Sequence, residues 1–196
     1  MRSLIVFNHP YEGSFCNAIL NAVTKGLQKA NHEVDLMHLD NDKFNPVMSQ
    51  ADLKAFLAHQ PIDPQVINYN QRLKRADHLI FIFPIWWDIM PATTKGFIDR
   101  VLFPGVVYDH NPRGFGLVPL LTNLKSVTII TTMNKPKVMY SLLIGNLIRK
   151  TMLRSVFKTM GYKRLNWISF TSVKSVSQEK RKNWLCSLEK RFSKFN

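Results

Sequence analysis

Five short apolar runs, rich in β-branched and aromatic residues, constrain the fold of this chain more than any other feature. They are SLIVFN (3–8), HEVDLMHL (32–39), HLIFIFP (78–84), SVTIITT (126–132) and NWISFTSV (166–173). Three of the runs are almost continuously hydrophobic, which is typical of strands that are covered on both faces. The sequence therefore predicts a sheet of five largely buried strands.

Segments with a helical spacing of apolar residues separate these strands. They cover residues 14–30, 64–76, 92–102 and 137–161. The last segment is long, and Gly145 is the expected place for a break. The alternation of strands and helices predicts a parallel sheet with helices on both faces and right-handed crossovers. Five strands favour a flavodoxin-like three-layer sandwich with strand order 2-1-3-4-5, formed by a single domain over residues 1–196.

The chain is strongly basic, with 27 lysines and arginines, 13 acidic residues and a formal charge of +14. Such a balance suits anionic partners, namely nucleotide phosphates, nucleic acid or an anionic membrane face. The basic segment 178–196 has the pattern of an amphipathic helix, with its lysines on a solvated face. Its apolar side consists of Trp184, Leu185, Leu188 and Phe192. We therefore expect no nucleic-acid partner, and leave a peripheral membrane partner open.

The two cysteines, Cys16 and Cys186, lie 170 positions apart. Their number and spacing indicate neither a disulfide framework nor a metal site, which favours a reducing cytoplasm. No apolar run approaches the roughly 20 residues that a membrane span needs. We expect a cytoplasmic protein without a bound metal.

In an open sheet of this order, ligands bind at the carboxyl ends of the strands where the strand order reverses. The loops at this point are 8–14, 84–91 and 131–136. The first, NHPYEGSFCN, leads into a helix whose free N–H groups form an anion site. Ser14, Asn17 and His9 can add donors to a phosphate there. The alternative is that Ser14 only caps the helix, Asn17 is a surface amide and His9 packs against the turn.

The second loop contains two adjacent tryptophans between Pro84 and Pro91. A flat aromatic ligand needs an apolar wall and a few backbone hydrogen bonds, which Trp86, Trp87 and the turn can supply. The alternative is that both indoles cover the core or an interface. The third loop, TTMNKP, offers the hydroxyl and N–H groups of Thr131 and Thr132 to the crevice. The alternative is that both are ordinary strand-end threonines. Together the three loops can take a phosphate, an aromatic ring system and its polar edges, which favours flavin mononucleotide (FMN) over a nicotinamide dinucleotide as the bound cofactor. The first loop contains neither the GxGxxG nor the GK[ST] motif of other nucleotide sites.

These residues resemble the NAD(P)H:quinone oxidoreductase family, the DT-diaphorase-like flavoproteins. HPYEGSFCNAIL is similar to the family's flavin-phosphate segment, and FPIWWDIMPATTKGFIDRVL to its Phe-Pro-x-x-Trp-x-x-x-Pro-x-x-x-Lys-x-x-x-[Asp/Glu]-Arg-Val segment. The resemblance implies a ping-pong enzyme in which NAD(P)H reduces the flavin and a quinone or similar small acceptor then takes the hydride. It also implies a homodimer with an active site shared across the interface.

The resemblance assigns individual roles as well. Phosphate and ribityl contacts fall on His9, Ser14, Phe15, Cys16 and Asn17. The wall of the flavin ring falls on Pro84, Ile85, Trp86 and Trp87, with Trp87 at the family's near-fixed position, and the ring edge on Thr131, Thr132 and Asn134. Tyr140 is the candidate for stabilising charge on the reduced flavin, and Tyr108 and His110 are candidate gates of the substrate pocket. Buried packing is an equal interpretation for Tyr108.

Several positions depart from the family pattern. Met133 and Asn134 stand where two glycines usually follow the threonines, so the ring edge is held differently. Asn146 stands near the position of an assisting histidine, which argues against a histidine relay. Asp88, at the mouth of the site, is expected to disfavour anionic acceptors. The shorter chain favours FMN over FAD.

A different class of function is an ancillary or regulatory subunit of a membrane transporter, a role that some relatives of this fold have. Nucleic-acid binding through the basic C-terminal helix is a third hypothesis, which the lack of interleaved exposed aromatic residues disfavours.

Overall fold

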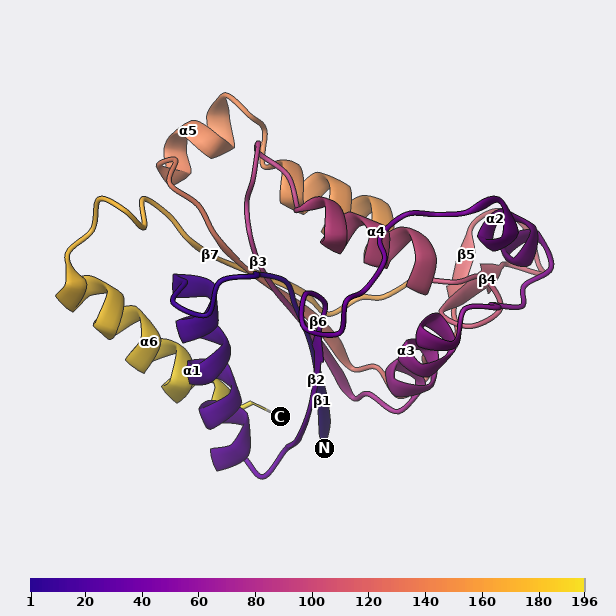
Figure 1. Cartoon of the computed structure of the whole chain (residues 1–196), viewed down its shortest axis with the longest axis horizontal. Coiled ribbons are helices and arrows are strands. Elements are labelled where there is room, and N and C mark those ends of the chain that lie inside the picture. Colours follow the sequence, from indigo (N-terminus) through magenta and orange to yellow (C-terminus); the bar gives the residue numbers. More distant parts are fainter. Residues whose placement is uncertain (196) are drawn as a thin grey trace.

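The computed structural model describes residues 1–195 and has a five-stranded parallel sheet at its centre. The strands lie in the order β2-β1-β3-β6-β7 (Figure 1), which is the predicted order because β4 and β5 lie outside this sheet. Their bounds are Arg2–Phe7 (β1), Glu33–His38 (β2), His78–Pro84 (β3), Ser126–Thr132 (β6) and Leu165–Phe170 (β7). Every residue of β3 and β6 is buried, as their continuous hydrophobicity predicted. The predicted fold class is confirmed.

Helices cover both faces of the sheet (Figure 1). One face carries α1 (Phe15–Lys29) and α6 (Gln178–Phe192), and the other carries α3 (Pro64–Lys74), α4 (Ala92–Val101) and the π-helix η1 (Arg149–Lys158). Successive residues of a strand point to opposite faces. Phe81 of β3 therefore packs against Phe97 of α4 and Phe157 of η1, while its neighbours Ile80 and Ile82 belong to the core beneath α1.

The C-terminal helix has the amphipathic packing that its sequence predicted. Leu188 and Phe192 of α6 are buried, and Trp184 and Leu185 pack against the same core cluster. The approach to α1 is close, because a Cβ atom added at Gly26 would lie 2.7 Å from the Cβ of Phe192. The apolar stripe of α6 thus closes one layer of the sandwich and leaves its charged side outside.

The long helical segment 137–161 is broken where expected. It forms α5 (Lys137–Leu142) and then η1, and between them Gly145 and Asn146 have φ values of 78° and 54°. The second half winds as a π-helix, and backbone bonds from Thr159 to Arg154 and from Tyr162 to Phe157 continue its i→i+5 pattern. The sequence did not predict this winding.

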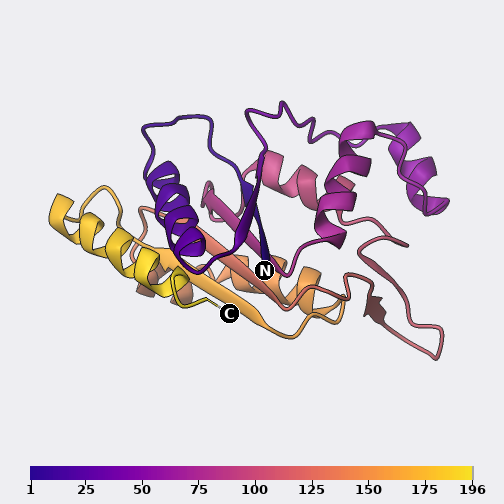
Figure 2. The ribbon, with the colours of Figure 1, turned by 90° about the horizontal axis from the view of Figure 1, so that it is seen from below.

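The two long connections outside the regular alternation contain short elements of their own. The first contains α2 (Gln50–Leu57), and the second contains the antiparallel pair β4 (Tyr108–His110) and β5 (Leu117–Pro119). Both lie at the same end of the molecule, beyond α3 and α4 (Figures 1 and 2). Within residues 1–195, no helix has both the length and the apolar character needed to cross a bilayer.

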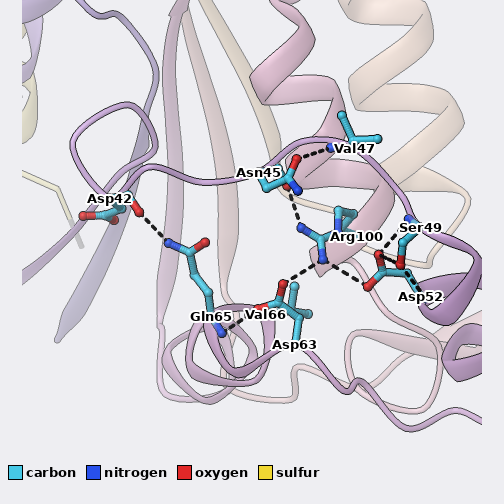
Figure 3. Close-up of polar contacts among 9 residues, drawn as sticks. All are labelled: Asp42, Asn45, Val47, Ser49, Asp52, Asp63, Gln65, Val66 and Arg100. Atoms are coloured by element: carbon cyan, nitrogen blue, oxygen red, sulfur yellow. Dashed lines mark hydrogen bonds and ion pairs between the residues drawn. The ribbon is translucent and has the colours of Figure 1, made fainter.

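A buried arginine of α4 fixes the first of these connections (Figure 3). Arg100 is 5% exposed and donates hydrogen bonds to Asp52, Asp63 and the carbonyl of Asn45. Asp52 also closes a capping box with Ser49 at the start of α2, and Asp63 caps α3. One guanidinium group therefore holds the starts of two helices, which explains why so long a connection is ordered.

Candidate functional site

Three loops meet where β1, β3 and β6 end, at the reversal of strand order. The strand ends are aligned because Phe7 is paired with Ile82 and Pro84 with Thr132. The backbone N–H of Ile85 donates to the carbonyl of Thr132 at 2.8 Å, so the second and third loops start side by side. The predicted loops are thus brought together at the expected edge of the sheet.

The first loop ends in a helix start with free donors. Ser14 is the N-cap of α1, with an extended backbone, and its Oγ accepts a hydrogen bond from the N–H of Asn17 at 3.1 Å. The N–H of Ser14 is used by the carbonyl of Tyr11. Among residues 1–195, the N–H groups of Phe15 and Cys16 have no acceptor, and they are the first-turn donors that can bind an anion.

His9 adds a donor beside this helix start. Its Nδ1 accepts a hydrogen bond from the N–H of Tyr11, and its partial burial lowers its pKa. The ring is therefore neutral at pH 7, and with Nδ1 accepting, the proton is assigned to Nε2, which can donate to a ligand. The amide of Asn17 already donates to the carbonyl of Glu12, so one of its two N–H groups serves the loop itself.

The side chain of Cys16 faces the interior. Its Sγ lies 3.2 Å from the hydroxyl of Thr132, which links the first loop to the third. Burial raises the pKa of this thiol to about 11, so it stays protonated at neutral pH. Only the backbone of Cys16 is available to a ligand. No group of three or more potential metal ligands occurs in the described part of the chain.

The second loop is a tight turn with a strained backbone. Trp86 and Ile89 exchange two backbone hydrogen bonds of 3.0 and 3.1 Å, and both residues between them have positive φ, 47° at Trp87 and 69° at Asp88. Two central residues with positive φ indicate a type I′ turn, a conformation that glycine and asparagine favour. A bulky tryptophan in this region is strained, and such strain concentrates at functional sites.

The two indoles have different surroundings. Trp86 is 46% exposed and lies edge-on to His9, with ring centroids 6.0 Å apart. Trp87 is 98% exposed and projects from the tip of the turn. Neither indole covers the core of the chain, so of the two alternatives only cover of an interface is left.

Asp88 is tied to its surroundings through both its side chain and its backbone. Its carboxylate pairs with the ammonium group of Lys135 on the third loop, at 2.5 and 2.6 Å. Its carbonyl accepts a hydrogen bond from the hydroxyl of Tyr140 at 2.9 Å, and that hydroxyl accepts one from the N–H of Ile148 at 3.1 Å. Tyr140 is 1% exposed, and burial raises its pKa.

The ion pair between Asp88 and Lys135 weakens the expectation that Asp88 repels anionic acceptors. Lys135 is the site residue that sequence reasoning missed, although its charge opposite Asp88 was a usable signal.

The third loop presents its backbone rather than its hydroxyl groups. The hydroxyl of Thr131 is buried and bonded to the indole N–H of Trp167 and to Ser169, and that of Thr132 is bonded to Cys16. Their hydroxyls are thus committed inside the protein, contrary to the expectation that they face the crevice. The amide oxygen of Asn134 accepts from the N–H of Lys174.

A hollow of about 250 Å³ lies between the second and third loops. It is lined by Ile85, Trp87, Asp88, Met133, Asn134 and Lys135. Apolar side chains and the ion pair of Asp88 and Lys135 therefore flank a space at the sheet edge where the first loop also ends. This arrangement can hold a flat ring system that carries a phosphate.

Tyr108 and His110 lie elsewhere in the chain. They belong to β4, whereas α5 and the three loops lie at the other end of α4 (Figure 1). Tyr108 lines a separate apolar cavity of about 450 Å³ with Phe56 and Met160, and His110 is exposed. Burial raises the pKa of Tyr108. Within one chain, these two candidates are not brought to the loops.

The sheet order and the helices on both faces define a flavodoxin-like protein. A family model described as flavodoxin-like fold matches residues 1–192, and the chain belongs to this family. The resemblance to NAD(P)H:quinone oxidoreductases seen in the sequence motifs is confirmed by the comparisons that follow.

Known oxidoreductases resemble the chain in sequence and in structure. A Haemophilus influenzae protein named an uncharacterized NAD(P)H oxidoreductase is 27% identical, with 93% of this chain and 89% of that protein covered. NAD(P)H dehydrogenase [quinone] 1 of Cavia porcellus is 30% identical over 72% of this chain, which spans 56% of that protein. The solved structure of an NAD(P)H:quinone oxidoreductase from Methanothermobacter marburgensis is 24% identical in sequence, and the match covers 100% of this chain and 99% of that one. Its TM-score of 0.88 shows that the two proteins share the fold.

Proposed function

We propose that this chain is an FMN-dependent NAD(P)H oxidoreductase that passes a hydride from NAD(P)H, through the flavin, to a quinone or similar small acceptor. The observation that carries the proposal is that a hollow between the second and third loops lies at the sheet edge where the first loop also ends, with the free N–H groups of Phe15 and Cys16. Its relatives support the same activity, and those reported above are named as oxidoreductases, none as a transporter subunit.

The residues of the three loops fit FMN. The first loop would bind the phosphate through the N–H groups of Phe15 and Cys16, Nε2 of His9 and the region around Ser14 and Asn17. Pro84, Ile85, Trp86 and Trp87 would form the wall beside the ring, and the backbone at Thr131, Thr132 and Asn134 would meet its edge. When bound, the flavin supplies the hydride-transfer chemistry, while the protein supplies position and electrostatics.

Tyr140 remains the candidate for influencing charge at the ring. In the observed geometry its proton is donated to the carbonyl of Asp88, so its first role is to hold the turn that carries Trp87. A hydrogen bond to the ring would need this hydroxyl to turn away from Asp88. We therefore assign Tyr140 as a positioning residue.

We also propose that two copies of the chain form a homodimer with a shared site. The candidate gates Tyr108 and His110 would then face the loops of the partner copy. The exposed apolar residues Trp87, Leu142 and Leu143 beside the site support such an interface. Both cysteines are free, which supports a cytoplasmic location. Light scattering of the purified protein tests the dimer.

The cofactor is tested by its absorption. The purified protein, supplied with FMN, should be yellow, release FMN on denaturation and oxidise NAD(P)H in the presence of a quinone. Ser14→Glu should abolish flavin retention, because a carboxylate would repel the phosphate. Ser177→Glu is the matched control, since Ser177 caps α6 in the same way but follows β7, outside the three loops of the site. A colourless wild-type protein without activity would contradict the proposal, and steady turnover would argue against a purely regulatory subunit.

A further inference from the structure

The outer side of η1 carries a basic hollow that the redox site does not use. It has a volume of about 520 Å³, and four of its lining side chains are cations. These are Arg149, Arg154, Lys158 and Lys163, which we call the basic pocket. No acidic residue lines the hollow. Across the described residues, none of the four cations pairs with a carboxylate.

The unusual winding of η1 gathers these charges. An i→i+5 ladder turns by about 82° per residue, so Arg154 and Lys158 lie about 50° and 20° from Arg149 around the helix. In an α-helix, which turns by about 100° per residue, they would lie about 140° and 180° away. The π-helix thus places three like charges on one stripe, although like charges repel each other.

The remaining walls suit a compact organic anion. Leu153 and Tyr162 are buried at the base of the hollow, and Leu165 is half-buried at the start of β7. The hydroxyl of Tyr162 donates to the carbonyl of Val107, so this wall is fixed. Lys163 extends the positive charge beyond the helix. A concave site with fixed walls and several cations differs from a flat basic surface, which would suit a long polyanion.

We propose that the basic pocket binds a ligand that carries two or more phosphate groups. Two arginines can each bind a phosphate through paired N–H groups, and the lysines add charge without fixed geometry. Binding would relieve the repulsion between the cations. The ligand is either a soluble polyphosphate compound or the phosphorylated headgroup of a lipid. The inference is independent of the proposed redox function, because none of the flavin-site residues lines this pocket.

Titration calorimetry with inorganic tripolyphosphate at low salt tests the site in the full-length protein. We expect one ligand per chain and weaker binding of orthophosphate. Arg149→Gln with Arg154→Gln should lower the affinity about tenfold per arginine. The matched control is Lys182→Gln with Arg191→Gln on α6, which removes the same charge from another exposed surface and should change the affinity by less than about twofold. Equal weakening by both pairs would overturn the proposal.

A charge-preserving exchange tests the role of geometry. Arg154→Ser with Ser155→Arg keeps the net charge and moves one cation off the stripe, so the affinity should fall about as far as with Arg154→Gln alone. Unchanged affinity, or no binding of tripolyphosphate at all, would refute a defined site. The four cations are exposed, so these variants should fold, which a thermal unfolding curve verifies.

Sedimentation with vesicles distinguishes the two sources of the ligand. Vesicles of phosphatidylcholine with phosphatidic acid should retain the protein only if a lipid headgroup enters the pocket. Retention that is lost in the Arg149 and Arg154 pair and reversed by tripolyphosphate identifies the lipid source. Binding of tripolyphosphate without retention identifies a soluble ligand. Retention that both double variants lose equally would count against the pocket.

Discussion

At the amino ends of β1, β3 and β6, polar side chains are buried and bonded to one another, whereas at the carboxyl ends an indole extends into solvent on a strained turn. The ring of His32 forms hydrogen bonds with the hydroxyl of Ser3 and the carbonyl of Phe195, and the ring of His78 forms one with the hydroxyl of Ser126. The two rings stack with centroids 5.6 Å apart. One end of the sheet thus fixes the two chain termini near each other, and the other keeps apolar and backbone groups available.

This difference shows where stability and function are separated in the fold. Residues at the amino end can be judged by their effect on unfolding alone. Residues at the carboxyl end hold conformations that cost free energy, which is expected where a ligand must be bound. Four predictions follow this separation, from the largest effect on stability to the smallest.

The amino end should make the protein sensitive to mild acid. Burial, together with the neighbouring His32, lowers the pKa of His78 to about 4 from 6.5, so between these pH values the unfolded chain binds more protons. Stability is complete above pH 6.5 and falls as the pH is lowered towards 4, by up to about 3 kcal/mol. Burial lowers the pKa of His32 as well, which acts in the same direction.

Urea unfolding at several pH values measures this effect. His78→Asn should be less stable at pH 7 but should lose less stability between pH 6.5 and 4.5. His110→Asn is the control, because His110 is exposed. The carboxylate of Asp77 has a lowered pKa through its bond from the N–H of Arg2, so its contribution is lost only below about pH 4. An equal pH slope in wild type and His78→Asn would contradict the role of His78.

At the carboxyl end, Tyr140→Phe should affect both stability and the site. The variant leaves the N–H of Ile148 and the carbonyl of Asp88 without their partner, at a cost of about 1–3 kcal/mol. Tyr162→Phe is a close match, because that hydroxyl also bridges a carbonyl and an N–H, at Val107 and Leu121. Both variants should lose similar stability, but only Tyr140→Phe should retain less flavin. Equal flavin retention would show that the turn does not depend on Tyr140.

Replacing the strained Trp87 should change the stability of the fold and the activity of the site in opposite directions. Trp87→Gly relieves a positive φ of 47° and removes a side chain that is 98% exposed, so the free energy of unfolding should rise by up to about 1 kcal/mol. Quinone reduction should fall because the wall of the site is lost. Asn31→Gly is the control, since Asn31 also has a positive φ, at the end of α1. A Trp87→Gly variant with full activity would place the flavin elsewhere.

The sequence predicted the strands and the switch-point loops because apolar periodicity and strand ends are local signals. It did not reveal which way the hydroxyls of Thr131 and Thr132 point. A strand that is buried on both faces lacks the alternation of apolar and polar residues that would indicate the direction of each side chain. The winding of η1 was also hidden, since many of its buried apolar residues are three or four apart, a spacing that an α-helix also has. Tyr140 was predicted as a site residue, and this stays a prediction. Its bond to Asp88 could not be predicted, because it depends on the break after α5, which places two separate segments together.

The exposed ion pair between Asp88 and Lys135 should have the smallest effect on stability. Lys135→Met should cost less than about 1 kcal/mol, since exposed pairs contribute little. It should, however, leave the carboxylate of Asp88 unpaired at the mouth of the hollow and lower the kcat/KM for anionic quinones relative to neutral ones. Lys95→Met, which breaks the exposed pair with Asp99 on α4, should change stability as little and leave this preference unchanged. If Lys135→Met also leaves the preference unchanged, the acceptor does not approach Asp88, and the hollow between the second and third loops is not its entrance.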